Sequence, residues 1–253
     1  MTSLVYNEDC LPALRKMADQ SVDLCCADPP YGLNIMGRVA PDTHTHTHTH
    51  THTHTHTHST RVGSSKPFGS KNRVGQKQKR PIEAKFYPVF DDGSPPDAEV
   101  FRELLRVSKK LIVWGGNFFL DNLGAASCMI VWDKKRRGMT QADCEIAWTN
   151  LKGQSRVFEF RWNGMLQENM KEKEARIHAT QKPVELYRYC YQLAGLQAGD
   201  TVLDPYMGSQ SSRIAAHDMG MNYIGYEINE TYYRLGNERY EAHIAQYSLW
   251  EDV

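Results

Sequence analysis

The segment Asp28-Pro29-Pro30-Tyr31 carries the side chains best suited to chemistry on an amine. It follows the apolar run 22–27, which we expect to be a buried strand. The amino group of an aromatic base is a weak nucleophile because its lone pair is delocalised into the ring. The Asp28 carboxylate and the Pro29 carbonyl are suited to accept the two amino protons, which would direct that lone pair at an electrophile. Tyr31 offers a flat face for stacking a base swung out of a duplex; the alternative is a proline-rich turn without chemistry.

A second motif, Asp204-Pro205-Tyr206-Met207-Gly208-Ser209, follows the apolar run 201–203. A glycine in such a turn lets the backbone approach a ligand closely, and the amino end of the following helix supplies N–H donors for a carboxylate. Glu227 ends the next predicted strand about twenty residues on, where a carboxylate can bind ribose hydroxyls. The pattern predicts a nucleotide-type cofactor cradle, and a plain strand–helix turn is the alternative.

Three motifs occur in a fixed order: Asp28 to Tyr31, then His178-Ala179-Thr180-Gln181-Lys182-Pro183, then Asp204 to Ser209. Together they resemble the S-adenosylmethionine-dependent amino-methyltransferases of DNA, in the permuted or beta-class order. The resemblance covers nearly the whole chain apart from residues 43–80. Trp132-Asp133-Lys134 and the stretch 145–149 resemble the branch found in phages and prophages.

The resemblance implies a role for each matching residue. The first motif would hold the target amine of double-stranded DNA, and S-adenosylmethionine would be the cofactor, with no metal. The implied cofactor contacts are Asp204, Pro205, Tyr206, Gly208 and Ser209 for the methionine part, Glu227 for the ribose, Asp9 and Cys10 for the adenine, and Thr180 with Lys182 for the carboxylate. Asp9 by itself could equally be a helix N-cap.

Two positions depart from the family pattern. Gln210 stands where members often have glycine, and Ala179 stands where they often have proline. Because glutamine is larger than glycine, we expect Gln210 to narrow or stiffen the cofactor cradle.

The implied reaction is direct in-line methyl transfer to an amine, without a covalent enzyme intermediate. None of the eleven prolines is followed by cysteine, which argues against the nucleophile of a carbon-five cytosine enzyme. Aspartate before Pro-Pro-Tyr favours adenine over cytosine by the same resemblance. A cytosine amino-methyltransferase, an RNA or protein amine methyltransferase, and a DNA-binding module without activity are the alternatives.

Contacts to DNA are expected in two places. Residues 134–177 are predicted to read sequence, with Lys134, Lys135, Arg136 and Arg137 on phosphates and Arg156, Arg161, Trp162 and Asn163 reaching base edges. An exposed basic turn and an ordinary hairpin are the alternative. The stretch 61–85 has eight basic residues and one acid, and Lys77, Lys79 and Arg80 in it are candidates for an arm that binds phosphates. A solvated loop is the alternative there.

Residues 43–58 are a strict Thr-His alternation that holds eight of the eleven histidines. Neither face of the repeat is apolar, so it cannot bury surface, and we expect residues 43–80 to be disordered. The repeat is therefore interpreted as an insertion that the chemistry does not need.

The elements that must position these motifs alternate along the chain. Strands are expected at 22–27, 111–114, 128–132, 145–149, 157–160, 201–203 and 222–228, and helices at 97–107, 183–193, 212–219 and from 229 towards 246. This alternation predicts an α/β fold, a single methyltransferase domain over 1–253 with a doubly wound, mostly parallel sheet. Asp28 and Asp204 should then end adjacent strands, where the strand order reverses.

Composition limits the cellular setting. The formal charge is zero, so DNA contact must come from local patches, and no stretch of eighteen apolar residues suggests a membrane span. Six cysteines without a Cys-x-x-Cys pair are typical of reduced thiols in a core. We therefore expect a cytoplasmic protein that associates with the nucleoid through DNA; a homodimer is compatible with the sequence.

Overall fold

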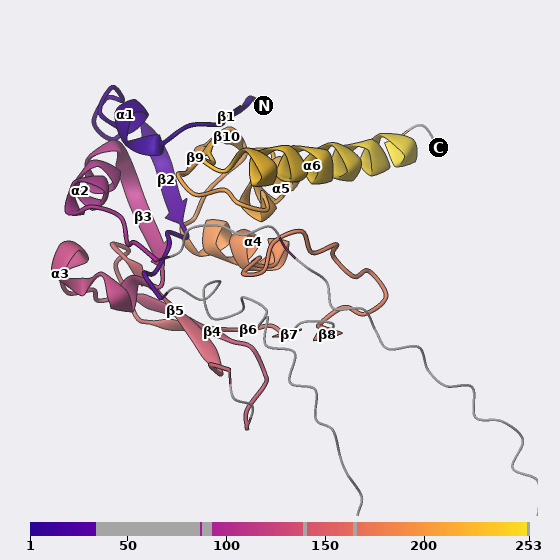
Figure 1. Cartoon of the computed structure of the whole chain (residues 1–253), viewed down its shortest axis with the longest axis horizontal. Helices are drawn as coiled ribbons and strands as arrows, with labels where there is room; N and C mark the ends of the chain where they lie inside the picture. The colour runs from indigo at the N-terminus through magenta and orange to yellow at the C-terminus, as the bar shows by residue number, and fades with distance from the viewer. Residues whose placement is uncertain (34–86, 88–92, 139–140, 164–165, 252–253) are drawn as a thin grey trace, which may run out of the picture. The chain divides into compact units, whose positions relative to one another are not determined.

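The computed structural model describes residues 1–33, 87, 93–138, 141–163 and 166–251 (Figure 1). The chain divides into two compact units, one of Met1–Val39 with Tyr87–Val253 and one of Ala40–Phe86, and every described residue belongs to the first unit. The stretch 43–80 lies outside the described residues, with Lys77, Lys79 and Arg80 in it. Its disorder and its contact with DNA therefore stay predictions.

The described unit is built on an eight-stranded sheet with the order β1-β10-β9-β2-β3-β5-β4-β6. Its strands are β1 (Ser3–Tyr6), β2 (Val22–Ala27), β3 (Ser108–Trp114), β4 (Met129–Asp133), β5 (Cys144–Thr149), β6 (Arg156–Glu159), β9 (Thr201–Asp204) and β10 (Asn222–Tyr226). Only β5 pairs antiparallel, with β3 and with β4. A separate hairpin joins β7 (Trp162–Asn163) to β8 (Leu166–Gln167). The predicted doubly wound, mostly parallel sheet is confirmed.

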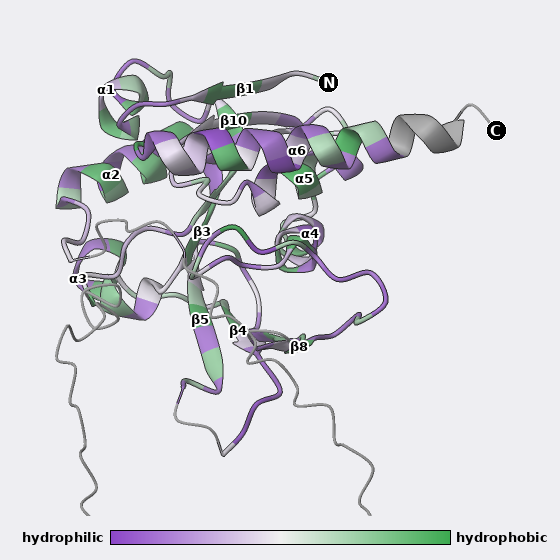
Figure 2. Cartoon of the chain, turned by 45° about the vertical axis from the view of Figure 1, so that its right-hand side comes forward, coloured by the Kyte–Doolittle hydropathy of each residue, from purple (hydrophilic) through white to green (hydrophobic). Residues whose placement is uncertain are grey.

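Helices cover both faces of the sheet. They are α1 (Cys10–Leu14), α2 (Ala98–Val107), the 3-10 turn η2 (Gly116–Phe118), α3 (Leu120–Leu123), α4 (Val184–Leu193), α5 (Ser211–Asp218) and α6 (Glu230–Glu251). Buried residues of α1, α2 and α3 share one apolar cluster, and those of α4 and α5 share the other. Figure 2 shows hydrophobic residues along β3 and many hydrophilic residues on α6. No helix in the described ranges is both long and apolar enough to cross a membrane.

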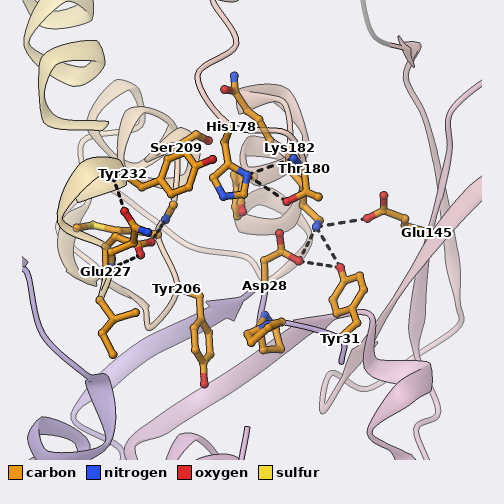
Figure 3. Close-up of a pocket in the computed structure, with 18 of the residues that line it drawn as sticks. Asp28, Tyr31, Glu145, His178, Thr180, Lys182, Tyr206, Ser209, Glu227 and Tyr232 are labelled. Atoms are coloured by element: carbon orange, nitrogen blue, oxygen red, sulfur yellow. Dashed lines mark hydrogen bonds and ion pairs between the residues drawn. The ribbon is translucent and has the colours of Figure 1, made fainter. Parts of the chain in front are cut away.

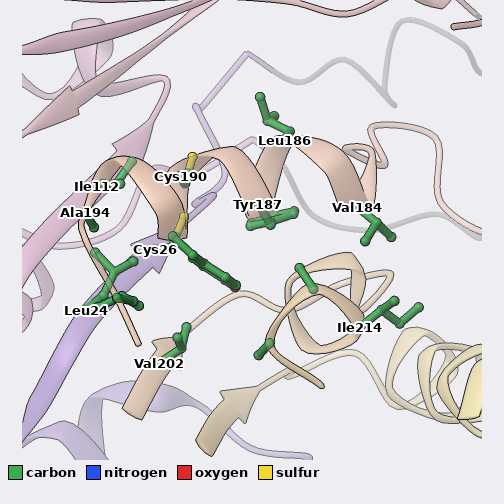
Figure 4. Packing of buried hydrophobic residues seen from close by; sticks show 14 of the residues in the cluster. Leu24, Cys26, Ile112, Val184, Leu186, Tyr187, Cys190, Ala194, Val202 and Ile214 are labelled. Atoms are coloured by element: carbon green, nitrogen blue, oxygen red, sulfur yellow. The ribbon is translucent and has the colours of Figure 1, made fainter. Parts of the chain in front are cut away.

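The strand β2 contributes to both clusters, as expected of a strand buried on both faces. Leu24 and Cys26 lie in the cluster with α4 and α5, where Figure 4 shows Cys26 close to Cys190. Cys25 and Ala27 lie in the cluster with α1 and α2. All six cysteines are free, and all except Cys144 are buried, as expected of thiols in a core.

The strand order reverses between β2 and β9. From β2 the chain continues through α2 to β3 on one side, and from β9 it continues through α5 to β10 on the other. The two strands pair in parallel, with Leu24 opposite Val202 and Cys25 opposite Leu203. Their carboxyl ends therefore meet, as predicted, at the edge of the sheet where ligands bind in such folds.

Candidate active site

A cavity of about 460 Å³ opens at the carboxyl ends of β2 and β9 (Figure 3). Its lining comes from segments far apart in the sequence: residues after β2 (from 28 to 33), Glu145 on β5, residues before and on α4 (from 178 to 187), residues 206–209 after β9, and residues after β10 (from 227 to 232). The volume lies within the range of about 300 to 1,000 Å³ that is usual for small-molecule sites. We call the group Asp28, Tyr31, Glu145 and Lys182 the Asp28 side, and the group His178, Thr180, Gly208 and Glu227 the Gly208 side.

The Asp28 carboxylate is held through one of its two oxygens. The Tyr31 hydroxyl donates to Asp28 Oδ1 at 2.7 Å, and Lys182 Nζ lies 2.5 Å from the same oxygen. Lys182 Nζ also donates to the Tyr31 hydroxyl oxygen at 3.1 Å. Figure 3 shows these contacts converging from one direction. No hydrogen bond or ion pair with the described residues involves Asp28 Oδ2, so this oxygen is left as an acceptor for a ligand.

The Tyr31 ring is fixed from several directions. It stacks on Phe118 with ring centroids 5.4 Å apart, and its edge meets Phe119. Gly115 passes so close that a Cβ there would lie 2.3 Å from Tyr31 Cε1, and its φ of +64° also favours glycine. Burial raises the pKa of the Tyr31 hydroxyl well above its usual range, so it remains a donor. Because Phe118 takes one face, a base has at most the opposite face of Tyr31 for stacking.

Lys182 is linked to two further charged residues. Its Nζ lies 3.3 Å from Glu145 Oε2, and Lys134 pairs with Glu145 Oε1. Burial opposes the charge on Glu145, but Lys182 and Lys134 outweigh it and lower its pKa to about 2. Burial by itself would lower the pKa of Lys182, but Asp28, Tyr31 and Glu145 outweigh burial and raise the pKa well above its usual range. Glu145 and Lys182 are therefore both ionised at neutral pH.

The position of Lys134 corrects one expectation. Its side chain is 10% exposed, it pairs with Glu145, and its Nζ lies 4.7 Å from the centre of the Trp132 ring. Burial lowers its pKa despite Glu145. A buried, paired ammonium is not available to a phosphate, so the predicted DNA contact by Lys134 is wrong. The run of basic residues 134–137 suggested an exposed patch, but Lys134 packs behind the site, against Glu145 and Trp132.

The neighbouring basic residues have other partners. Lys135 pairs with Glu168 at 3.1 Å, and Arg136 Nε donates to the Ala142 carbonyl at 2.9 Å. Arg137 pairs with Asp133 at 2.8 Å but keeps an exposed side chain. Arg161 is also exposed. Both β5 and β6, within the predicted recognition segment 134–177, are strands of the central sheet.

His178 lines the Gly208 side. The backbone N–H of Thr180 donates to His178 Nδ1 at 3.2 Å, and the ring packs against Tyr232 with centroids 4.1 Å apart. Burial, with the charges of Lys182 and Arg176, lowers the pKa of His178 to about 3. The ring is therefore neutral, and its proton is placed on Nε2 because Nδ1 accepts.

Glu227 and the turn after β9 form the floor of the Gly208 side. The Gly208 N–H donates to Glu227 Oε2 at 2.9 Å, and the Asn229 N–H donates to Oε1 at 2.8 Å. Gly208 has a φ of +42°, in the region that favours glycine. Burial raises the pKa of Glu227 against these two hydrogen bonds. The carboxylate is thus held in one orientation at the cavity, with lone pairs to spare.

Asp204 lies beneath the cavity rather than in it. Its side chain is fully buried, and its carboxylate accepts from the Tyr206 N–H at 3.0 Å and from the Ser212 hydroxyl. Burial raises its pKa to about 7, and the nearby charges of Asp28 and Glu227 act in the same direction. Asp204 therefore shapes the turn that carries Tyr206 and Gly208; Pro205 does not line the cavity either.

Gln210 does not narrow the cradle, contrary to expectation. Its buried side chain is directed to α6, where Nε2 donates to the Tyr233 carbonyl at 3.3 Å and to Asn237 Oδ1 at 3.1 Å. Arg213 donates to Gln210 Oε1 at 2.9 Å. The backbone has a φ of +59°, the left-handed conformation that glycine adopts freely. The substitution therefore ties the turn to α6 and leaves the cavity open.

Asp9 and Cys10 lie outside the cavity lining. Asp9 is the N-cap of α1, since its carboxylate accepts from the Leu11 N–H at 3.0 Å. Cys10 is buried at the start of the same helix. The N-cap alternative is thus confirmed for Asp9, and contact of either residue with a cofactor stays a prediction.

Sequence reasoning missed Glu145, His178 and Tyr232 as residues of the site. Glu145 carries the one signal that was available, an acidic residue in the otherwise apolar run Cys144–Thr149. His178 belongs to a motif that was recognised, but no role was given to its side chain. Tyr232 lies on α6 and has no local signal.

Comparisons with known proteins agree on one family. Residues 131–238 match the DNA methylase family of N6 and N4 enzymes. Type II methyltransferase M2.DpnII of Streptococcus pneumoniae is 24% identical over 249 residues, which cover 94% of this chain and 90% of that protein. DNA adenine methyltransferase YhdJ of Escherichia coli K12 is 41% identical over 65 residues, 26% of this chain and 22% of that protein.

Solved structures share the fold. A protein of Thermus thermophilus described as a DNA modification methylase, TTHA0409, aligns with a TM-score of 0.52 at 16% identity, over 96% of each chain. The cytosine-N4-specific PvuII DNA methyltransferase aligns with a TM-score of 0.53 at 12% identity, over 98% of this chain and 92% of that chain. At these identities the likeness supports the methyltransferase fold and nothing finer.

Proposed function

Because the chain belongs to the N6/N4 DNA methylase family, we propose that it methylates the exocyclic amino group of adenine in duplex DNA. The observation that carries the proposal is the position of Asp28 at the end of β2, with Oδ2 uncommitted in a cavity shared with the turn after β9. The name of one relative, DNA adenine methyltransferase YhdJ, supports the choice of base. A site of this kind needs a flipped base, which the cavity at the sheet edge can receive.

S-adenosylmethionine is the proposed cofactor, and the Gly208 side fits it. Gly208 has no side chain to fill the cradle, and Glu227 presents a fixed carboxylate suited to ribose hydroxyls. When bound, the cofactor supplies an electrophilic methyl group on a sulfonium. Thr180 and the neutral His178 would lie at its amino-acid end, while Asp9 and Cys10 are proposed for its adenine.

The chain's own residues would act on the amine. Asp28 Oδ2 and the Pro29 carbonyl would accept hydrogen bonds from its two N–H groups, which favours a pyramidal nitrogen and counters the positive charge that grows on it. Lys182 and Tyr31 hold the carboxylate in one orientation through Oδ1. Catalysis by positioning is the main contribution, since no covalent intermediate is needed.

DNA contacts remain part of the proposal. We assign a contact with a base edge to Arg161. We assign phosphate contacts to Lys135, Arg136 and Arg137, and to Lys77, Lys79 and Arg80 in the basic stretch. Replacing the last three together should reduce the salt slope of DNA binding by about one unit per lost phosphate contact. An unchanged slope would leave the solvated-loop alternative for that stretch. We also propose that the protein forms a homodimer and associates with the nucleoid through its contacts with DNA.

The test is incubation with cofactor labelled at the methyl group and separate pools of duplex DNA, RNA and protein. The proposal predicts label in DNA alone, recovered after digestion as N6-methyladenine, and a rate of labelling about 1,000-fold lower with Asp28→Ala. Recovery as N4-methylcytosine would replace adenine by cytosine as the substrate. Label in RNA or protein alone would overturn the proposal.

A further inference from the structure

Four charged side chains form a line along the wall of the Asp28 side. Lys134 pairs with Glu145, Glu145 Oε2 lies 3.3 Å from Lys182 Nζ, and Lys182 Nζ lies 2.5 Å from Asp28 Oδ1. The charges alternate along this line and sum to zero. Figure 3 shows its inner part, with Lys182 between Asp28 and Glu145.

Lys182 is directed at Asp28 and not at the cofactor turn. Within the described ranges, every polar contact of its Nζ is with Asp28, Tyr31 or Glu145. The resemblance had placed Lys182 near the cofactor carboxylate beside Thr180. In the structure the Thr180 side chain lies instead by His178, with Oγ1 3.1 Å from Nδ1.

Glu145 carries a second observation that points to a function. Its Oε2 is buried and has no hydrogen-bond partner among the described residues, although Lys182 Nζ is 3.3 Å away. A buried carboxylate oxygen without a donor is costly in a purely structural ion pair. In the wall of a cavity, Glu145 Oε2 provides an acceptor toward which the Lys182 ammonium can shift when a ligand hydrogen-bonds to Asp28.

We propose that Lys182, held by Glu145 and Lys134, is the positioning residue that orients Asp28, and that Glu145 draws its charge away from the reacting amine. The inference rests on the proposed function. An ammonium next to Asp28 fixes the carboxylate through Oδ1 and leaves Oδ2 for the amine. The same ammonium would oppose the positive charge that grows on the amine, and Glu145 offsets this effect.

The test is a double-mutant cycle on Glu145→Gln and Lys182→Met, with single-turnover methylation and cofactor affinity measured for each variant. Glu145→Gln should lower the methylation rate about 30-fold, and Lys182→Met about 100-fold, with cofactor affinity within about threefold of wild type. In the Lys182→Met background, Glu145→Gln should have almost no further effect, because Glu145 acts through Lys182. Glu185→Gln is the matched control, since Glu185 pairs with Arg188 outside the cavity.

A pH profile supplies a readout that a structural role would not move. The charged and titratable groups around Lys182 are Asp28, Tyr31, Glu145, Lys134 and His178. Removing the Glu145 charge lets burial lower the pKa of Lys182, so the basic limb of the rate should move to lower pH in Glu145→Gln. This profile and the Glu145→Gln rate decide the question if Lys182→Met does not fold.

Two results would overturn the inference. A loss of cofactor affinity greater than about tenfold in Lys182→Met would place Lys182 at the cofactor. An undiminished methylation rate in Glu145→Gln would show that Glu145 is not needed to hold Lys182 in place. A wild-type chain that methylates no DNA would contradict the proposed function, and the cofactor affinities would still locate Lys182.

Discussion

The Asp28 side of the cavity is built from acidic and basic side chains and the Tyr31 hydroxyl, which pair with one another. The Gly208 side instead presents backbone amides, a neutral histidine and one carboxylate held by amides. On the Asp28 side, Lys182 and Glu145 come from distant segments and fix each other's charge. On the Gly208 side, the partners of Glu227 are the N–H groups of Gly208 and Asn229. Such a division suits a ground-state binding site next to a site where charge develops.

The two sides also differ in whether side chains or backbone groups set their geometry. The orientation of the Asp28 carboxylate depends on side chains, so single substitutions should affect the rate strongly. The shape of the Gly208 side depends largely on its backbone, so substitutions there should affect cofactor binding and not the rate at saturating cofactor. The predictions below test this separation, from the largest expected effect to the smallest.

Replacing Asp28 by alanine should break the Asp28 side alone. We expect methyl transfer at saturating cofactor to fall about 1,000-fold, or about 4 kcal/mol, because an acceptor of the amine protons is lost. Single-turnover kinetics on duplex DNA measures this rate. Asp28→Asn should keep partial activity, since one acceptor remains; a rate equal to wild type in Asp28→Ala would remove Asp28 from the chemistry.

Asp204 lies under the Gly208 side and should give stability a pH dependence. Its pKa is raised to about 7 in the folded chain from an ordinary 3.8, so its contribution is present at low pH and is lost as pH rises through 7. We expect the free energy of unfolding of the wild type to fall by about 3 kcal/mol between pH 5 and 8, and we expect Asp204→Asn to lack this fall. Urea unfolding of both proteins across this range is the measurement, and parallel curves would show that Asp204 is ionised throughout.

Replacing Glu227 by alanine should break the Gly208 side. The variant loses the acceptor for the Gly208 and Asn229 amides as well as the proposed ribose contact. We expect cofactor affinity to fall about 30-fold, or about 2 kcal/mol, with the rate at saturating cofactor within a few-fold of wild type. Cofactor titration with rate measurements tests this; an unchanged affinity would mean that Glu227 does not bind the cofactor.

Gln210→Gly should have the smallest effect and should sharpen the account of the turn. Loss of the contacts with Tyr233, Asn237 and Arg213 should destabilise the fold by about 1 kcal/mol, partly offset because glycine suits a φ of +59°. Cofactor affinity should stay within about twofold, since the side chain lies outside the cavity. A gain in affinity greater than about tenfold would restore the idea that Gln210 narrows the cradle.

Local signals explain what the sequence could predict. The Asp28 motif, the Gly208 turn and their strands are each written in a few consecutive residues, and the pairing of β2 with β9 follows from the rule for doubly wound sheets. The strand β1 was not predicted because none of its four residues is buried, and the helix α1 was not predicted because its five residues are too few to show a helical apolar pattern. The side chain of Gln210 was misplaced because its partners lie on α6, out of reach of local reasoning.

The Asp28 side shows where prediction stops. Lys182 lies 151 positions from Tyr31, and no periodicity reveals that its ammonium reaches the first motif. Lys134 begins a basic run that suggests the surface, yet Trp132 and Glu145 enclose it. Contacts between charged side chains far apart in the sequence depend on the final packing of the sheet. These contacts set the positions of Lys182 and Lys134 in the site.

The central claim is that the cavity has two sides with separable tasks, and cofactor titration of Asp28→Ala beside Glu227→Ala tests it most directly. The account predicts that Asp28→Ala binds S-adenosylmethionine within about threefold of wild type, while Glu227→Ala binds it about 30-fold more weakly. Isothermal titration calorimetry of the two variants, each checked for a cooperative melting transition, is the measurement. Equal losses of affinity in both variants, or a larger loss in Asp28→Ala, would contradict the division.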